Sequence, residues 1–111
     1  MKEVKQYNGE MIQAYQPKDL AKLNSVFAAA KALWVQQWIE QGAVDEGSCC
    51  GGKGISVPFI GKGKRNYEYV NVVSCDFVQG NIAAYKSVGE VLAFLKKEGV
   101  VGASYNDGWM D

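Results

Sequence analysis

The 111-residue chain contains no histidine, and this absence restricts its chemistry more than any other feature of the composition. Without imidazole there is no histidine general base, no Ser-His-Asp or Cys-His nucleophile and no imidazole-ligated metal site. The sequence also lacks a paired-carboxylate motif, a nucleophile elbow and a cofactor fingerprint. These absences favour a non-catalytic protein, and we expect neither a cofactor nor a metal.

The chain also lacks net charge and long apolar runs. Its 12 basic and 12 acidic residues cancel, which argues against nucleic acid as a partner and leaves self-association unopposed by repulsion. The longest apolar stretches are interrupted by Lys31, Gln36 and Gln37, so none reaches the roughly 18 to 20 residues of a membrane span. The N-terminus has no signal-peptide apolar region. We therefore expect a cytoplasmic protein that does not cross a membrane.

Cysteine is scarce, with three residues in all, an odd number that does not suit a disulfide framework. Cys49 and Cys50 are adjacent in a glycine-rich connector, residues 43–54. Their spacing matches neither a structural zinc site nor a C-x-x-C redox pair. Cys75 is expected in the core, and a reactive thiol at Cys49 or Cys50 remains an alternative function.

The composition, with 48% apolar and 22% charged residues, is that of an ordinary globular chain and predicts a single domain over residues 1–111. The hydrophobic pattern predicts an α+β fold of order αβββαβ, with a mostly antiparallel sheet packed by one long and one short helix. We expect helices over residues 18–41 and 87–97, and strands over residues 55–59, 66–78, 82–85 and 100–105.

Local signals predict a hairpin near the N-terminus and the ends of the helices. Asn8-Gly9 predicts a hairpin within residues 1–16, a segment that the pattern otherwise leaves undefined. Pro17 suits the first turn of the long helix, and Asn24-Ser25 could break that helix into two pieces. Ser87 matches the N-cap of a capping box at the start of the second helix.

Two signals concern the position of strands in the sheet. Pro58 cannot donate to a β-ladder, so residues 55–59 are expected at a sheet edge. Residues 66–78 carry apolar side chains at both odd and even positions, which is typical of a central strand covered on both faces.

The long helix has a wider apolar arc than a one-sided surface helix needs. Either the helix is covered on two sides within the monomer, or part of it forms a dimer interface. Trp34 and Trp38 lie one turn apart on it and, with Tyr67 and Tyr69, could line a pocket for an apolar ligand between helix and sheet. The alternative for these aromatic residues is packing in the core or in a dimer interface.

A basic cluster precedes the two tyrosines and consists of Lys62, Lys64 and Arg65. Basic groups beside aromatic rings could hold a single nucleic-acid strand or a phosphorylated ligand. The alternative is a solvated loop that protects a sheet edge. The preferred hypothesis is a non-catalytic binding or interaction module that acts as a homo-oligomer, in particular a homodimer; a thiol-dependent enzyme or stress protein and a nucleic-acid-associated protein are the alternatives.

Overall fold

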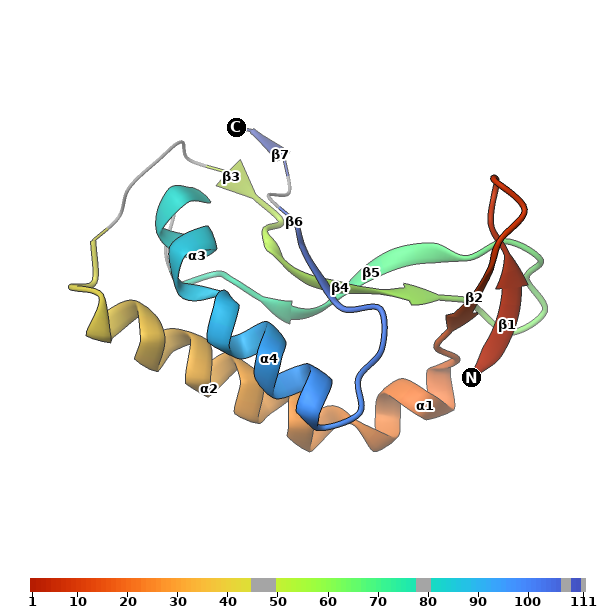
Figure 1. Cartoon of the computed structure of the whole chain (residues 1–111), viewed down its shortest axis with the longest axis horizontal. Coiled ribbons are helices and arrows are strands. Elements are labelled where there is room, and N and C mark those ends of the chain that lie inside the picture. The colour runs from red at the N-terminus through yellow and green to blue at the C-terminus, as the bar shows by residue number, and fades with distance from the viewer. Residues whose placement is uncertain (45–49, 78–80, 107–108, 111) are drawn as a thin grey trace.

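The computed structural model describes residues 1–44, 50–77, 81–106 and 109–110, and Figure 1 shows how their helices and strands are arranged. In chain order the elements are β1 (Lys2–Lys5), β2 (Met11–Ala14), α1 (Pro17–Lys22), α2 (Asn24–Glu40), β3 (Cys50–Gly51), β4 (Gly54–Phe59), β5 (Glu68–Ser74), α3 (Asn81–Ser87), α4 (Gly89–Lys97), β6 (Ser104–Asn106) and β7 (Trp109–Met110). The named strands all pair antiparallel, as β1 with β2, β3 with β7, and β5 and β6 with β4. The predicted α+β class is confirmed.

The predicted N-terminal hairpin is present as β1 and β2. Gly9 occupies a positive φ of 90°, which glycine adopts without a steric penalty. The side-chain oxygen of Asn8 accepts a hydrogen bond of 3.0 Å from the backbone N–H of Glu10. The Asn-Gly pair therefore lies in the turn, but the loop covers residues 6–10 and only Gly9 has a positive φ, so this is not the two-residue turn that the pair favours.

The central strand of the three-stranded sheet is β4, with β5 and β6 at the edges. Both sequence-based placements, β4 at an edge and the long segment of β5 at the centre, are wrong. Pro58 is tolerated in a central strand because β6 pairs only with residues 54–56 and ends before it. On that side the carbonyl of Pro58 accepts a 2.8 Å bond from Tyr15, so the missing N–H removes no ladder bond.

A β-bulge explains why β5 has apolar residues at both odd and even positions. Val70 pairs with Val57 and Val73 with Ile55, although the two valines differ in parity. The register shifts between Ile55 and Ser56, so one extra residue of β5 changes which positions face the core. The alternation therefore reflects a register change in an edge strand, not a strand buried on both faces.

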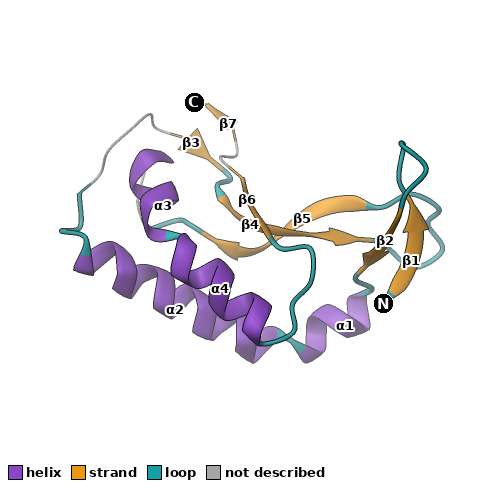
Figure 2. Ribbon diagram, in the orientation of Figure 1, coloured by secondary structure: helices purple, strands orange, loops and turns teal. Residues whose placement is uncertain are grey.

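The helices lie on one side of the three-stranded sheet (Figure 2). Trp34 of α2 is fully buried between these layers, and its ring makes edge contacts with Phe77 and Tyr105 at centroid distances of 5.8 and 6.1 Å. Ile55 and Val57 of β4 are also 0% exposed in the same cluster. The core therefore fills the space between α2 and the sheet with aromatic and branched side chains.

Residues 82–85, predicted as a strand, belong to helix α3, and that prediction is wrong. Alanine is the strongest helix former, and Ala83 and Ala84 occupy the middle of this segment. Both alanines are buried in the cluster around Trp34, where small side chains allow α3 to approach α2 closely. The sequence is misleading at this point, because a short continuous run of apolar residues is compatible with a strand and with a buried helix.

The predicted capping box of the second helix is also wrong. Ser87 is the last residue of α3, and the N-cap of α4 is Val88, which makes no side-chain cap bond. The hydroxyl of Ser87 instead points back to the carbonyls of Ala83 and Ala84, at 2.9 and 3.1 Å. Serine often bonds backward in this way when it lies within a helix.

The long predicted helix is divided in two, as the sequence suggested. The break falls at Leu23, one residue before Asn24, and Pro17 lies in the first turn of α1 as expected. α2 ends before Gly42, whose φ of 98° suits the left-handed position after a helix. The last predicted strand is shorter than expected and covers only β6. Among the described residues, no helix is long and apolar enough to cross a membrane.

Candidate functional site

The two tryptophans proposed as ligand-binding residues are held in the core or close to it. Trp34 is 0% exposed, and its indole N–H donates to Ser87 Oγ at 3.0 Å. Trp38 is half-buried, contacts Phe77 at a ring-centroid distance of 5.6 Å and donates to the carbonyl of Val44 at 2.8 Å. These contacts favour the packing interpretation of the two tryptophans, because their polar atoms and ring faces are already used.

The two tyrosines belong to another part of the structure. Tyr67 packs on a small cluster formed by Val4, Ala14 and Ile60, under the N-terminal hairpin. Its ring lies 5.8 Å from that of Tyr69, which is 58% exposed. The ring contacts thus form two separate groups. One is the pair of Tyr67 and Tyr69, and the other joins Trp34 and Trp38 to Phe77, Tyr105 and Tyr85.

Cys75 is the cysteine whose side chain the structure describes. Cys49 lies outside the described residues, and Cys50 is described only as the backbone partner of Met110 in the β3–β7 pair. Cys75 is buried as predicted, and burial raises the pKa of its thiol to about 12 despite the opposing charge of nearby Lys53. The described part of the chain contains no group of three or more Cys, Asp or Glu residues placed to hold a metal.

The basic cluster lies in the loop between β4 and β5, where Lys62, Lys64 and Arg65 are all exposed. Only Lys62 of these lines a cleft of about 340 Å³, which it shares with Lys2 of β1 and Lys18 of α1. Sequence reasoning did not identify Lys2 or Lys18, because both are far from the loop in the chain. We call this cleft, lined by Lys2, Gln16, Pro17, Lys18, Gly61, Lys62 and Gly63, the lysine cleft.

Alternation along β1 explains how Lys2 reaches the lysine cleft. Lys2 and Val4 occupy the same face of the strand, and Val4 packs on Ile60 immediately before the loop. Tyr15 attaches the other end of the hairpin to the same segment, since its carbonyl accepts a 2.9 Å bond from the N–H of Ile60. These contacts bring β1, the start of α1 and the loop together (Figure 1).

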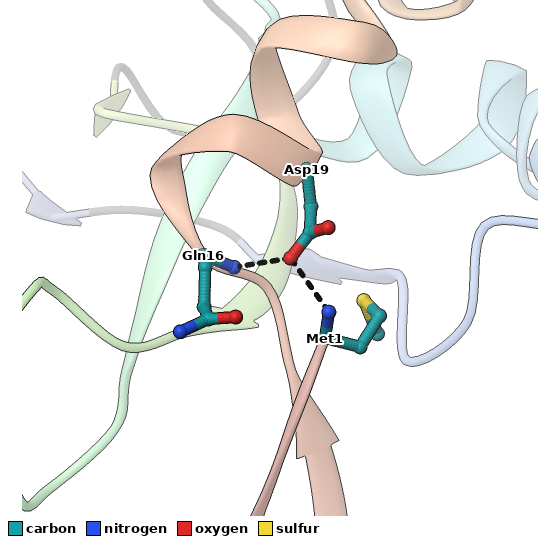
Figure 3. Close-up of polar contacts among 3 residues, drawn as sticks. All are labelled: Met1, Gln16 and Asp19. Atoms are coloured by element: carbon teal, nitrogen blue, oxygen red, sulfur yellow. Dashed lines mark hydrogen bonds and ion pairs between the residues drawn. The ribbon is translucent and has the colours of Figure 1, made fainter.

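Asp19, the acidic residue of α1, does not line the lysine cleft. One carboxylate oxygen of Asp19 accepts a 2.9 Å bond from the backbone N–H of Gln16 and forms a 2.8 Å ion pair with the amine of Met1 (Figure 3). The bond to that amine, followed by the bond from Gln16, lowers the pKa of Asp19 below its ordinary value. Asp19 is therefore ionised at neutral pH and its charge is already balanced.

The outer face of the sheet carries a second hollow, of about 680 Å³, whose walls combine polar residues with Tyr69 and Val70. Ser56 donates to Asn71 Oδ1 at 2.6 Å, and the amide of Asn106 donates to the same oxygen at 2.7 Å. One residue of each strand of the three-stranded sheet contributes to this network. Because the three side chains bond to each other, they fasten the strands together.

The side of α2 that faces away from the core is exposed and uncharged. Five side chains that follow one another there at three- and four-residue steps are Ser25, Ala28, Ala32, Val35 and Ile39, which we call the α2 outer face; the exposed Ala29 and Gln36 lie beside them. Ile39 is 58% exposed, and only Val35 is half-buried. Lys31 and Glu40 are the only charged residues of α2, and Lys31 is paired with Asp76 at 2.9 Å.

The chain was compared with protein-family models, with curated proteins and with solved structures, and no match was found in any of the three.

Proposed function

We propose that this protein is a non-catalytic interaction module that forms a homodimer through the α2 outer face. The observation that supports the proposal is that the exposed side of α2 carries small, apolar and uncharged polar side chains, with a charged residue only at its end, Glu40. A surface helix of a monomer normally carries charged residues on its exposed side. The centres of protein interfaces, in contrast, are depleted in charged residues.

A second copy in antiparallel orientation is the partner that the charges favour. Lys22 precedes α2 and Glu40 ends it, and both side chains are exposed. In an antiparallel pair, Lys22 of each copy lies near Glu40 of the other, and the helix dipoles oppose each other. A parallel pair would instead place like charges together at both ends.

The spacing of the α2 outer face suits helix pairing. Steps of three and four residues keep a seam of side chains on one side of a helix over several turns. The small side chains of Ala28 and Ala32 allow close approach at the middle of this seam. One helix face is small beside the ~800 Å² per partner of a standard interface, so we expect a weak, concentration-dependent dimer.

Sedimentation velocity over a range of protein concentrations tests this proposal with the variant Ala32→Glu. Ala32 lies at the middle of the α2 outer face, so a glutamate there faces its own copy in the dimer. The matched control is Ala93→Glu, which makes the same change at an exposed position of α4. We expect the wild type and the control to associate at tens of micromolar and the Ala32→Glu variant to sediment as a monomer.

Two results would contradict the proposal. One is a wild-type protein that remains monomeric at high concentration, and the other is association that the Ala32→Glu variant retains in full. Circular dichroism of both variants shows whether the helices are intact, and exposed alanine-to-glutamate changes in helices are expected to preserve the fold.

A further inference from the structure

We propose that the lysine cleft binds a small phosphorylated ligand with at least two negative charges. Three segments that are distant in sequence meet there, and each contributes one lysine that lines the cleft: Lys2, Lys18 and Lys62. Among the described residues, those that line the cleft include no carboxylate. In a chain whose net charge is zero, this arrangement concentrates positive charge at one concave place.

The electrostatic setting supports an anion over a neutral ligand. Each of the three lysines carries one positive charge, and a multivalent anion in the cleft is attracted by all of them. Lysine binds phosphate as a compact point charge with three donors. Asp19, the carboxylate in the first turn of α1, binds Met1 and Gln16, and the charge of Lys18 also acts on it, but Asp19 does not line the cleft.

The size of the cleft restricts the ligand to a small molecule. Its volume of about 340 Å³ is near the lower end of the ~300–1,000 Å³ that ligand pockets span. The three lysines surround one compact volume, whereas a single-strand groove follows a backbone over several nucleotides. Lys64 and Arg65 are exposed but do not line the cleft, so the loop as a whole is not the proposed site.

Inorganic pyrophosphate is the probe for this inference. Its binding to the whole chain is measured by two-dimensional amide NMR. We expect saturable shifts at Lys18 and at Gly61–Gly63, and an affinity that falls as sodium chloride is added. The double variant Lys2→Gln/Lys18→Gln should bind roughly tenfold or more weakly, since it removes two of the three positive charges of the lysines that line the cleft. The matched control Lys64→Gln/Arg65→Gln also removes two positive charges and should bind pyrophosphate as the wild type does.

Three outcomes would overturn the inference. The first is the absence of saturable shifts at millimolar pyrophosphate, and the second is equal weakening by the two double variants, which would indicate a diffuse basic surface. The third is tight binding of a single-stranded oligonucleotide with pyrophosphate unable to compete, which would favour the nucleic-acid alternative. Spectra of the unliganded variants must retain the wild-type pattern outside the mutated segments.

Discussion

The indole N–H of Trp34 donates to the hydroxyl of Ser87 at 3.0 Å, and both residues are buried. This bond joins α2 to the end of α3 across 53 positions of the sequence. The same hydroxyl donates to the carbonyls of Ala83 and Ala84. The buried indole N–H therefore has an acceptor, and the hydroxyl that accepts from it also has acceptors for its own proton. Ser87 therefore stabilises a helix contact and does not begin a helix.

The first prediction concerns this bond. Ser87→Ala should destabilise the protein by about 1–3 kcal/mol, because the buried indole N–H loses its shorter partner and keeps only Ala84 at 3.3 Å. Urea unfolding measures the change, and Ser104→Ala, at an exposed position, should stay within ~0.5 kcal/mol of the wild type. Equal stability of wild type and Ser87→Ala would mean that this bond makes no net contribution to the free energy of unfolding.

The second prediction concerns Gly54 of β4. A Cβ atom there would overlap the carbonyl oxygen of Val73 and lie 3.2 Å from the side-chain nitrogen of Asn71. Gly54→Ala should therefore force the strands apart and destabilise the sheet by about 1–3 kcal/mol or more. Gly89→Ala is the control, because open space surrounds that helical position, and it should stabilise by about 0.4–1 kcal/mol. Thermal unfolding of both variants would show opposite shifts, and a neutral Gly54→Ala would contradict the predicted clash.

The third prediction follows from the thiol of Cys75. Burial raises its pKa from 9.0 to about 12, so folding favours the protonated form. The stability that this group contributes is fully present below pH 9 and is lost as the pH rises towards 12. Between about pH 8 and pH 11, the wild type should therefore lose more stability than Cys75→Ala in urea unfolding. Parallel losses in the two proteins would indicate that Cys75 titrates normally.

The fourth prediction tests the thiol alternative at Cys49 and Cys50. In the Cys75→Ala variant, a small alkylating probe at neutral pH should label Cys49 or Cys50 rapidly if either is a functional thiolate. The control is Cys49→Ser/Cys50→Ser, in which the remaining Cys75 should react only after unfolding, because it is buried. If Cys49 and Cys50 also need unfolding before they react, the thiol hypothesis is wrong.

The fifth prediction distinguishes the orientation of the proposed dimer. Lys22→Glu or Glu40→Lys alone should weaken an antiparallel pair roughly twofold to tenfold, since exposed ion pairs contribute about 0.2–1 kcal/mol each. The double variant Lys22→Glu/Glu40→Lys should restore association, because opposite charges again meet at both ends. Sedimentation of the three variants measures this, and a double variant no stronger than the singles would exclude the antiparallel arrangement.

Local chemistry determined those parts of the fold that depend on neighbouring residues. Asn8-Gly9 forms its turn, Pro17 lies in the first turn of α1, and Gly42 follows the end of α2. Each of these outcomes depends on backbone preferences that are fixed within a few residues. The α+β class could be predicted from the hydrophobic periodicity, and the burial of Cys75 from the tendency of free cysteine to be buried.

Only the tertiary structure decided which partner each element and side chain would have. β4 is central because β6 pairs with it short of Pro58, and residues 82–85 are helical because Ala83 and Ala84 pack against Trp34. The lysine cleft forms because Val4 and Tyr15 contact the segment that leads to Lys62. Such long-range contacts depend on how whole surfaces fit together, and no pattern of neighbouring residues encodes them.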